Sequence, residues 1–393
     1  MKIAILGFGT VGSGVKHILE NVHTSYLNDI QISHILIRKG KKKTLSIMCD
    51  DIQEILEDNS VDVVVETIGD IEPAHTYILQ ALKHKKHVVT ANKAVVARYL
   101  NEFTQCAKEN NVQFRYEASV GGGIPWIEGL SKAMRIDKIY KLFGIFNGTS
   151  NYILDHMERY SSSFCSILKQ AQKAGYAEAD PSADIDGFDI ANKLCISASL
   201  AFHIHIPLDF PVFGIRNITK EDVKYFSSLK LHVRLIGKAA CTDSSYACFV
   251  EPSLFKETTL ESACHDNFNF ITLYGETIGH LSFFGPGAGK LPTANAVIQD
   301  ILDIKSAVPY LVPSFTDNKT SDASLFFCDY ILRVQKDAYS HIHLPYEVHI
   351  YNHQEYLHFH HRSSYEIHMM TQNILTIDPQ AFMVSIHESE GKI

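Results

Sequence analysis

The sequence has no C-x-x-C pair and no long apolar run, and each absence excludes a class of protein. The eight cysteines are scattered along the chain. That pattern suits free thiols in a reducing compartment and argues against a disulfide framework or a zinc site. No segment is long and apolar enough to cross a membrane. The N-terminal residues also lack the layout of a signal peptide, so we expect a cytoplasmic protein without a membrane partner.

An excess of positive charge is missing as well. The chain has 36 lysine and arginine residues against 44 aspartate and glutamate residues, a net charge of -8. This balance argues against nucleic acid as a partner. No internal repeat is visible, which leaves an ordinary globular protein. Its 393 residues are more than one ordinary hydrophobic core can organise, so we expect two or three domains.

The N-terminal part alternates between patterns typical of strands and of helices. Short apolar runs at residues 2–6, 30–37, 61–66, 87–89 and 113–117 predict buried strands. Helical patterns such as residues 73–83 and 94–109 separate some of them. The alternation predicts an α/β fold, a Rossmann-type doubly wound sheet that is mostly parallel. Lys93 follows a strand's carboxyl end, the edge of such sheets where ligands bind.

A glycine motif follows the first predicted strand. Gly7, Gly9 and Gly12 form G-x-G-x-x-G between a strand and a helix. The first glycine permits a tight turn, the second lets a pyrophosphate approach the backbone, and the third lets helix and strand pack closely. An ordinary strand–helix turn is the alternative. The context favours a dinucleotide site with phosphate at the helix N-terminus.

The end of the second predicted strand indicates which dinucleotide binds. NAD sites usually carry Asp or Glu there, which binds the ribose 2′-hydroxyl. This chain has Arg38 followed by Lys39. Arg38 is placed to bind a 2′-phosphate, so we predict NADP, with NAD as the alternative. A solvated basic loop would account for residues 41–43 and accounts less well for Arg38.

The acidic stretch at residues 175–194 is the centre of the functional argument. Asp184 onward predicts one helix to residue 200, on which Asp189 and Lys193 are four residues apart and share a face. Glu178 enters from the preceding loop. Several carboxylates around one lysine can bind a substrate ammonium and also hold a proton donor. From spacing alone a surface ion pair is the stronger interpretation, but the rest of the chain reverses it.

The alternation changes after about residue 125. A strand at 138–147, a helix starting near Tyr152 and capped by residues 148–151, and a helix at 164–174 predict an α+β domain. Further strands are expected around Tyr225 to Glu251 and within 268–284. The predicted domains are therefore residues 1–125, completed by 285–306, a second α+β domain at 126–284 whose sheet could pair across a two-fold axis, and a small C-terminal α+β domain at 307–393.

Several motifs together resemble the homoserine dehydrogenase family over roughly residues 1–306. They are GFGTVGSGV, ETIG, TANKAVVA, EASVGGGIP, FNGTSNYI, GYAEADPSADIDGFDIANK and GPGAGKLPTANAV. The segment around Asp184 is specific, whereas the glycine motif alone is not. The resemblance implies NAD(P)-linked, reversible reduction of L-aspartate 4-semialdehyde to L-homoserine, in threonine and methionine biosynthesis. It also implies that residues 126–284 are a catalytic and dimerisation domain, and that the protein is a homodimer or homotetramer.

The resemblance assigns roles residue by residue. It implies dinucleotide contacts at Gly7, Phe8, Gly9, Thr10, Val11, Gly12, Arg38, Thr67, Lys93 and Gly289. It implies substrate contacts at Gly148, Thr149, Tyr176, Glu178, Asp184, Asp189 and Lys193. Lys193 matches the proton donor and Lys93 a second catalytic lysine. The carbonyl groups of Glu117, Val120, Gly122 and Ile124 match a site for a monovalent cation, usually sodium.

The C-terminal part departs from the family pattern. Residues 328–334 resemble the first strand of an ACT regulatory module, but the glycine-bearing turn expected next is missing. We therefore expect a degenerate or repurposed ACT-like domain, and little effect of threonine on activity. His358, His360 and His361 suggest a metal site, yet strand alternation with surface histidines is the better interpretation.

Two other functions deserve comparison. One is a different NADP-linked reductase of the aspartate pathway, such as dihydrodipicolinate reductase, which the acidic cluster around Lys193 disfavours. The other is a catalytically silent NADP-binding sensor, which the presence of both Lys93 and Lys193 disfavours. Oxidation of NADPH with aspartate semialdehyde, and then with other aldehydes, separates the three.

Overall fold

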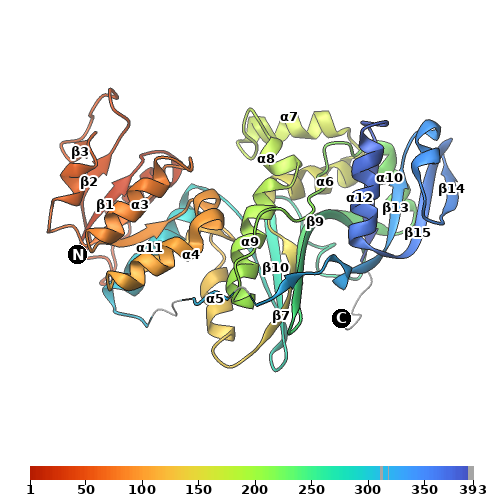
Figure 1. The fold of residues 1–393 in the computed structure, drawn as a ribbon. Helices are drawn as coiled ribbons and strands as arrows, with labels where there is room; N and C mark the ends of the chain where they lie inside the picture. The colour runs from red at the N-terminus through yellow and green to blue at the C-terminus, as the bar shows by residue number, and fades with distance from the viewer. Residues whose placement is uncertain (310–312, 317, 388–393) are drawn as a thin grey trace. The chain divides into compact units, whose positions relative to one another are not determined.

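The computed structural model describes residues 1–309, 313–316 and 318–387, which form two compact units (Figure 1). The first unit comprises Met1–Ile136, Cys195–Leu208 and Gly285–Thr316. The second comprises Asp137–Leu194, Asp209–Phe284 and Asp317–Ile393. Among the described residues, no helix has the length and apolar character that spanning a bilayer requires.

A six-stranded parallel sheet forms the centre of the first unit, and the predicted Rossmann-type fold is confirmed. Its order is β3-β2-β1-β4-β5-β6. The strands are β1 (Lys2–Leu6), β2 (Gln31–Leu36), β3 (Met48–Cys49), β4 (Val63–Glu66), β5 (His87–Thr90) and β6 (Phe114–Arg115). The order reverses beside β1, because β2 pairs on one side and β4 on the other. Ligands bind at such a reversal, beyond the carboxyl ends of the strands.

Several helices of this unit pack on that sheet. The unit contains α1 (Thr10–Asn21), α2 (Gln53–Leu56), α3 (Ala74–Lys83), α4 (Lys93–Glu109), α5 (Trp126–Ala133) and α11 (Lys290–Lys305), with a 3-10 turn, η1 (Glu117–Ser119). The late helix α11 packs on α1 so closely that a Cβ on Gly14 would lie 2.7 Å from the Lys290 carbonyl oxygen. Val297 and Ile301 of α11 share a buried cluster with Ile3 and Ile5.

A ten-stranded sheet organises the second unit. Its path is β11-β10-β7-β8-β9-β16-β13-β15-β14, and β12 pairs with β9. The first strands along the chain are β7 (Ile139–Ile145), β8 (Leu231–Cys241), β9 (Ser245–Lys256), β10 (Phe268–Gly275), β11 (Gly279–Pro286) and β12 (Thr320–Ser321). β8 and β9 form a long antiparallel hairpin in the middle of this strand order.

The helices of the second unit correct three predictions. They are α6 (Gly148–Tyr160), α7 (Phe164–Ala174), α8 (Ser182–Ile185), α9 (Phe188–Phe202, continuing into the first unit), α10 (Lys220–Ser228) and α12 (Ser364–Leu375). The helix expected near Tyr152 begins at Gly148, because Asn147 caps it. The single helix expected from Asp184 is two helices, broken beside Gly187 at φ +89°. Tyr225 lies in α10 and not in a strand, since Thr219 and Asp222 form a capping box.

The C-terminal strands extend the same sheet. They are β13 (Phe327–Arg333), β14 (Glu347–Tyr351), β15 (Gln354–Ser363) and β16 (Phe382–Ile386), with 3-10 turns η2 (Ala323–Leu325) and η3 (Lys336–His341). Helix α12 lies against β13 and β15 (Figure 1). β16 pairs with β9 in parallel, so the tail is hydrogen-bonded to the β8–β9 hairpin.

A buried ionic network joins this tail to the hairpin. The Lys238 ammonium on β8 lies 2.6 Å from Glu251 Oε1 on β9. His368 Nε2 of α12 lies 2.7 Å from Glu251 Oε2, and the Tyr330 hydroxyl donates to the same carboxylate. Burial would raise the pKa of Glu251, but the attraction of Lys238 and the His368 hydrogen bond outweigh it and lower that pKa to about 2.

Candidate active site

The glycine-rich loop of the first unit has the shape that a dinucleotide needs. Gly7 has φ +91°, and a Cβ there would lie 2.9 Å from the Thr67 carbonyl oxygen. A Cβ on Gly12 would lie 2.4 Å from the Gly7 carbonyl oxygen. A Cβ on Gly9 would meet nothing within 4 Å, so open space lies before the N-terminus of α1, where Thr10 begins the helix. This space fits a pyrophosphate.

The other predicted cofactor residues of this unit have separate positions. The Thr67 hydroxyl donates to the carbonyls of Leu6 and Gly7, and so fixes the glycine loop. Phe8 and Val11 pack against the apolar core beneath that loop. Arg38 follows β2, is exposed, and pairs with Asp70 at 3.2 Å. Gly289, at φ +139°, precedes α11.

A buried carboxylate that the sequence argument did not select holds two strand ends together. Glu66, at the end of β4, accepts hydrogen bonds from Ile68 N at 2.6 Å and from the Thr90 hydroxyl at 2.5 Å. Burial raises the pKa of Glu66. Asn92 caps α4, whose first residue is Lys93, and its backbone N–H donates to the Thr90 hydroxyl. A carboxylate ending an otherwise apolar strand was the signal that could have identified Glu66.

Two buried carboxyl groups lie at the loop predicted to bind a cation, one from Glu117 and one from Asp300 of α11. Glu117 accepts hydrogen bonds from the backbone of Ile127 and Glu128 at the start of α5. Its own backbone N–H donates to Asp300 of α11 at 2.9 Å. Burial, with the charge of Asp300, raises the pKa of Glu117 to about 8. Burial also raises the pKa of Asp300 to about 7.

The residues of this loop fit a monovalent cation. Gly121 and Gly122 adopt φ values of +83° and +63°, which turn the chain sharply. The Glu117 carbonyl accepts one long hydrogen bond, of 3.3 Å, from Val120 N, and the Ile124 carbonyl accepts one from Trp126 N. A carbonyl oxygen has a second lone pair. The loop thus offers carbonyl oxygens as ligands beside two carboxyl groups whose ionised form burial disfavours. Oxygen ligands of this kind suit a hard cation.

In the second unit, the structure brings Asp184 and Asp189 together with Lys193, but not the Glu178 carboxylate. The Lys193 side chain is buried, and its ammonium lies 2.6 Å from the Phe146 carbonyl oxygen. It lies 2.7 Å from Asp189 Oδ2. The amide of Asn147 donates to Asp184 Oδ1 and to Asp189 Oδ2, each at 2.7 Å. The surface ion pair considered from spacing is therefore excluded, because this pair is buried.

The remaining predicted substrate residues surround the N-terminus of α6 and the loop after α7. The Thr149 hydroxyl donates to the Tyr176 carbonyl at 2.7 Å. A Cβ on Gly148 would lie 2.5 Å from the Asn267 carbonyl oxygen, so only glycine fits there. Tyr176 and Glu178 are exposed. The Glu178 backbone, but not its carboxylate, is bound by Gln172 at 3.0 Å.

Two asparagines of this unit, Asn147 and Asn269, were not predicted as site residues. Asn147 lies within the motif FNGTSNYI but was treated only as the end of a strand. Its side chain accepts from Ser150 N and so caps α6. Asn269 of β10 is buried, and its amide donates to the Phe146 carbonyl at 2.9 Å. An asparagine directly before a helical pattern is an N-cap signal, which could have identified Asn147.

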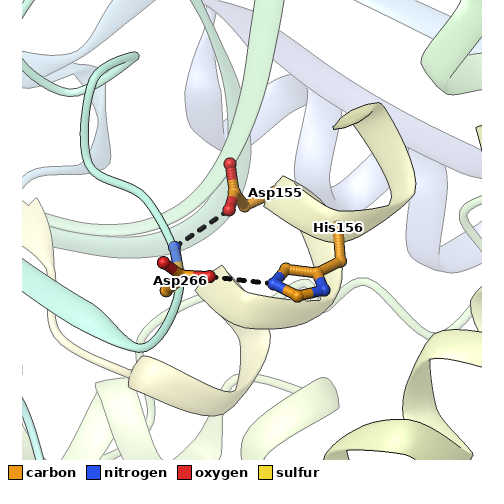
Figure 2. Close-up of side chains that lie close together, drawn as sticks. All are labelled: Asp155, His156 and Asp266. Carbon is orange, nitrogen blue, oxygen red and sulfur yellow. Dashed lines mark hydrogen bonds and ion pairs between the residues drawn. The ribbon is translucent and has the colours of Figure 1, made fainter. Parts of the chain in front are cut away.

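Metal-like clusters elsewhere in the described residues have structural explanations. Asp155, His156 and Asp266 lie close together (Figure 2). Arg159 lies 3.3 Å from Asp155 and 3.6 Å from Asp266, which supplies the positive charge there. The tail histidines bind different partners: His358 contacts the Tyr225 hydroxyl and His360 contacts Asp329. His358, His360 and His361 all lie on β15, as the strand interpretation expects. The surface position expected for His358 is wrong, because it is buried against Tyr225.

Family models cover most of the first 302 residues. The model described as homoserine dehydrogenase matches residues 125–302. The model described as homoserine dehydrogenase, NAD binding domain, matches residues 7–117. The match at residues 125–302 contains the Lys193 cluster, and the match at residues 7–117 contains the glycine-rich loop.

Curated relatives extend the similarity beyond these matches. A homoserine dehydrogenase of Bacillus subtilis (strain 168) is 36% identical over 343 residues, which are 83% of this chain and 79% of that protein. A homoserine dehydrogenase of Synechocystis sp. is 38% identical over 316 residues, covering 77% of this chain and 73% of that protein.

Solved structures include the C-terminal part. A homoserine dehydrogenase from Thiobacillus denitrificans has a TM-score of 0.87 at 30% identity, and covers 99% of this chain and 98% of that chain. A hyperthermophilic archaeal homoserine dehydrogenase mutant, solved in complex with NADPH, has a TM-score of 0.69 at 25% identity. It covers 79% of this chain and 99% of that chain.

Proposed function

The chain belongs to the homoserine dehydrogenase family of NAD(P)-dependent oxidoreductases, and we propose that Lys193 is the proton donor of its reaction. The observation that carries the proposal is the burial of the Lys193 ammonium between a carboxylate and a carbonyl. Lys93, the first residue of α4 at the carboxyl edge of the parallel sheet, is proposed as the second catalytic lysine.

The bound dinucleotide supplies the hydride, and the chain manages one proton. Reduction of an aldehyde needs a donor at the developing alkoxide. A lysine in water is a poor donor, because its pKa is about 10.4. The Asp189 carboxylate keeps the Lys193 side chain charged and fixes its direction, so the ammonium acts as an acid and as an electrostatic clamp. Asp184 and the exposed Glu178 are proposed to bind the substrate ammonium.

We propose that NADP is preferred over NAD, because Arg38 follows β2 where NAD sites carry an acidic residue. The exposed Arg38 guanidinium is available to a 2′-phosphate if it leaves Asp70. Arg38→Ala is expected to lower kcat/KM for NADP by about 10-fold or more and to leave that for NAD nearly unchanged, as loss of a charge-assisted contact predicts. The measurement is steady-state kinetics with both cofactors; equal wild-type kcat/KM values for NAD and NADP would contradict the preference.

We also propose that the loop carrying Glu117, Val120, Gly122 and Ile124 binds sodium or a similar ion through its carbonyl oxygens. A ligand that binds only the folded state raises the unfolding temperature. Sodium chloride should therefore raise it more than choline chloride at equal ionic strength. Thermal unfolding in the two salts measures the difference, and identical curves would count against the cation.

The tail is proposed to be a degenerate or repurposed ACT-like domain. After β13, the 3-10 turn η3 stands where the family pattern leads us to expect a glycine-bearing turn. Millimolar threonine should therefore change the activity by less than about twofold, because regulation needs a second site coupled to the first. A threonine titration at sub-saturating homoserine checks this, and strong inhibition would show that the regulatory site has survived.

Assembly and location are further proposals. We propose a homodimer or homotetramer in the cytoplasm, with a small molecule as the substrate and neither nucleic acid nor membrane as a partner. The eight cysteines, free in the structure, are compatible with a reducing compartment. Light scattering coupled to gel filtration gives the oligomer size, and a monomeric active species would overturn this proposal.

A further inference from the structure

The Asn147 side chain occupies an unusual position between two carboxylates. Its amide nitrogen donates to Asp184 Oδ1 and to Asp189 Oδ2, both at 2.7 Å. Its amide oxygen accepts from Ser150 N at 2.7 Å, which caps α6. Asn147 itself is buried. All three polar contacts fix one orientation of the amide, because only the nitrogen end can donate to carboxylates.

The carboxylates that it joins come from different helices. Asp184 belongs to the short helix α8, and Asp189 to the first turn of α9, with the break at Gly187 between them. Two carboxylates held near one another repel, and burial increases that repulsion. A neutral group that donates to both holds them together without adding charge. The amide therefore fixes the geometry across the break between α8 and α9.

The same short segment also fixes Lys193. The carbonyl oxygen of Phe146 accepts from the Lys193 ammonium at 2.6 Å and from the Asn269 amide at 2.9 Å. Asp189 Oδ2 accepts from both Asn147 and Lys193. Displacement of Asn147 would thus move one carboxylate and one carbonyl that together orient the ammonium.

We infer that Asn147 is a positioning residue of the reaction, which aligns Asp184 and Asp189 and through Asp189 directs the Lys193 ammonium. The inference rests on the proposed role of Lys193. It assigns to Asn147 a function that its helix-capping bond alone does not require, since serine and aspartate cap helices equally well.

That equivalence allows capping and positioning to be tested separately. Asn147→Ser keeps an oxygen for the cap and removes both amide donors. Asn147→Asp also keeps the cap, and places a third carboxylate beside the other two. Thr219→Ala is the matched control, because it removes the cap of α10 in the same unit without touching Lys193 or its partners.

Each variant is assayed for homoserine oxidation with NADP across a pH series. Asn147→Ser should lower kcat by about 10-fold or more and change the KM for NADP by less than about twofold, because misdirected catalytic groups lose rate and not cofactor binding. Asn147→Asp should lose more, and its acidic limb should move to higher pH, since added negative charge favours protonated lysine. Thr219→Ala should keep the wild-type kcat and pH profile.

A folded Asn147→Ser protein with wild-type kcat and pH profile would overturn the inference. Lys193→Ala, assayed alongside, distinguishes the two possible failures. If Lys193→Ala is inactive while Asn147→Ser is fully active, only the positioning role fails. If Lys193→Ala is also active, the proposed donor is wrong and the inference about Asn147 is lost with it. Circular dichroism of each variant shows whether it is folded.

Discussion

Lys193→Ala is expected to lower kcat for reduction of aspartate semialdehyde by about 10²-fold or more, the usual contribution of a positioned general acid. The ammonium is held against Asp189 and the Phe146 carbonyl, so alanine removes the charged donor that these two groups orient. The dinucleotide should still bind, because its glycine-rich loop belongs to the first unit. Stopped-flow NADPH oxidation gives the rate, and NADPH fluorescence gives the binding.

Lys224→Ala is the matched control for this experiment. Lys224 is an exposed residue of α10 in the same unit, and its loss should leave kcat unchanged. Near-normal turnover in a folded Lys193→Ala protein would remove Lys193 from the reaction. Rapid NADPH oxidation by wild type with many simple aldehydes would instead question the specificity of the substrate site.

Lys238→Met is expected to destabilise the folded chain by about 3–5 kcal/mol, the usual cost of removing one partner from a buried ion pair. The Glu251 carboxylate would lose the ammonium that lies 2.6 Å from it. The His368 and Tyr330 contacts would remain. Urea-induced unfolding followed by circular dichroism measures the loss. The double variant Lys238→Met with Glu251→Gln should recover much of it, because no buried charge is then left alone.

The pH dependence of this pair has a definite sign. The pKa of Glu251 is lowered from 4.5 to about 2 in the folded chain, so its ionised form stabilises the fold above pH 4.5. That contribution is lost as the pH falls from 4.5 toward 2. The difference in stability between wild type and Glu251→Gln should shrink over the same interval. An exposed control, Lys224→Met, should change stability by less than about 0.5 kcal/mol.

Local sequence signals predicted the first unit well. Each of the five apolar runs forms one parallel strand of the observed sheet, and only the two-residue edge strand β3 was not predicted. The glycine motif could be placed because residue spacing and backbone requirements act within a few residues. The sequence marks Glu66 as a carboxylate that ends an apolar strand, but not its bond to Thr90, which lies 24 residues away and meets it only in the fold.

In the second unit, local sequence signals predicted some elements wrongly. The apolar spacing from Asp184 to Leu200 predicted one helix, but the chain breaks at Gly187, which adopts φ +89°. A Cβ there would also lie 3.0 Å from Val212 and Val250. Tyr225 was placed at the start of a strand segment, whereas the capping box at Thr219 starts a helix that contains it. The pairing of Asp189 with Lys193 was predictable from their separation of four residues. The contribution of Asn147 was not, since it lies 42 residues from Asp189.

The position of α11 determines when the first unit can finish folding during synthesis. Its apolar residues, Val297 and Ile301 among them, fill the same cluster as Ile3 and Ile5 of β1. The first 136 residues therefore leave the ribosome before their core is complete. More than 150 further residues are synthesised before α11 is made. Since domains generally fold as units during synthesis, the nascent N-terminal sheet must stay partly open while the second unit is made. A fragment that ends at residue 284 should consequently bind chaperones or aggregate, even though it contains the whole glycine-rich loop.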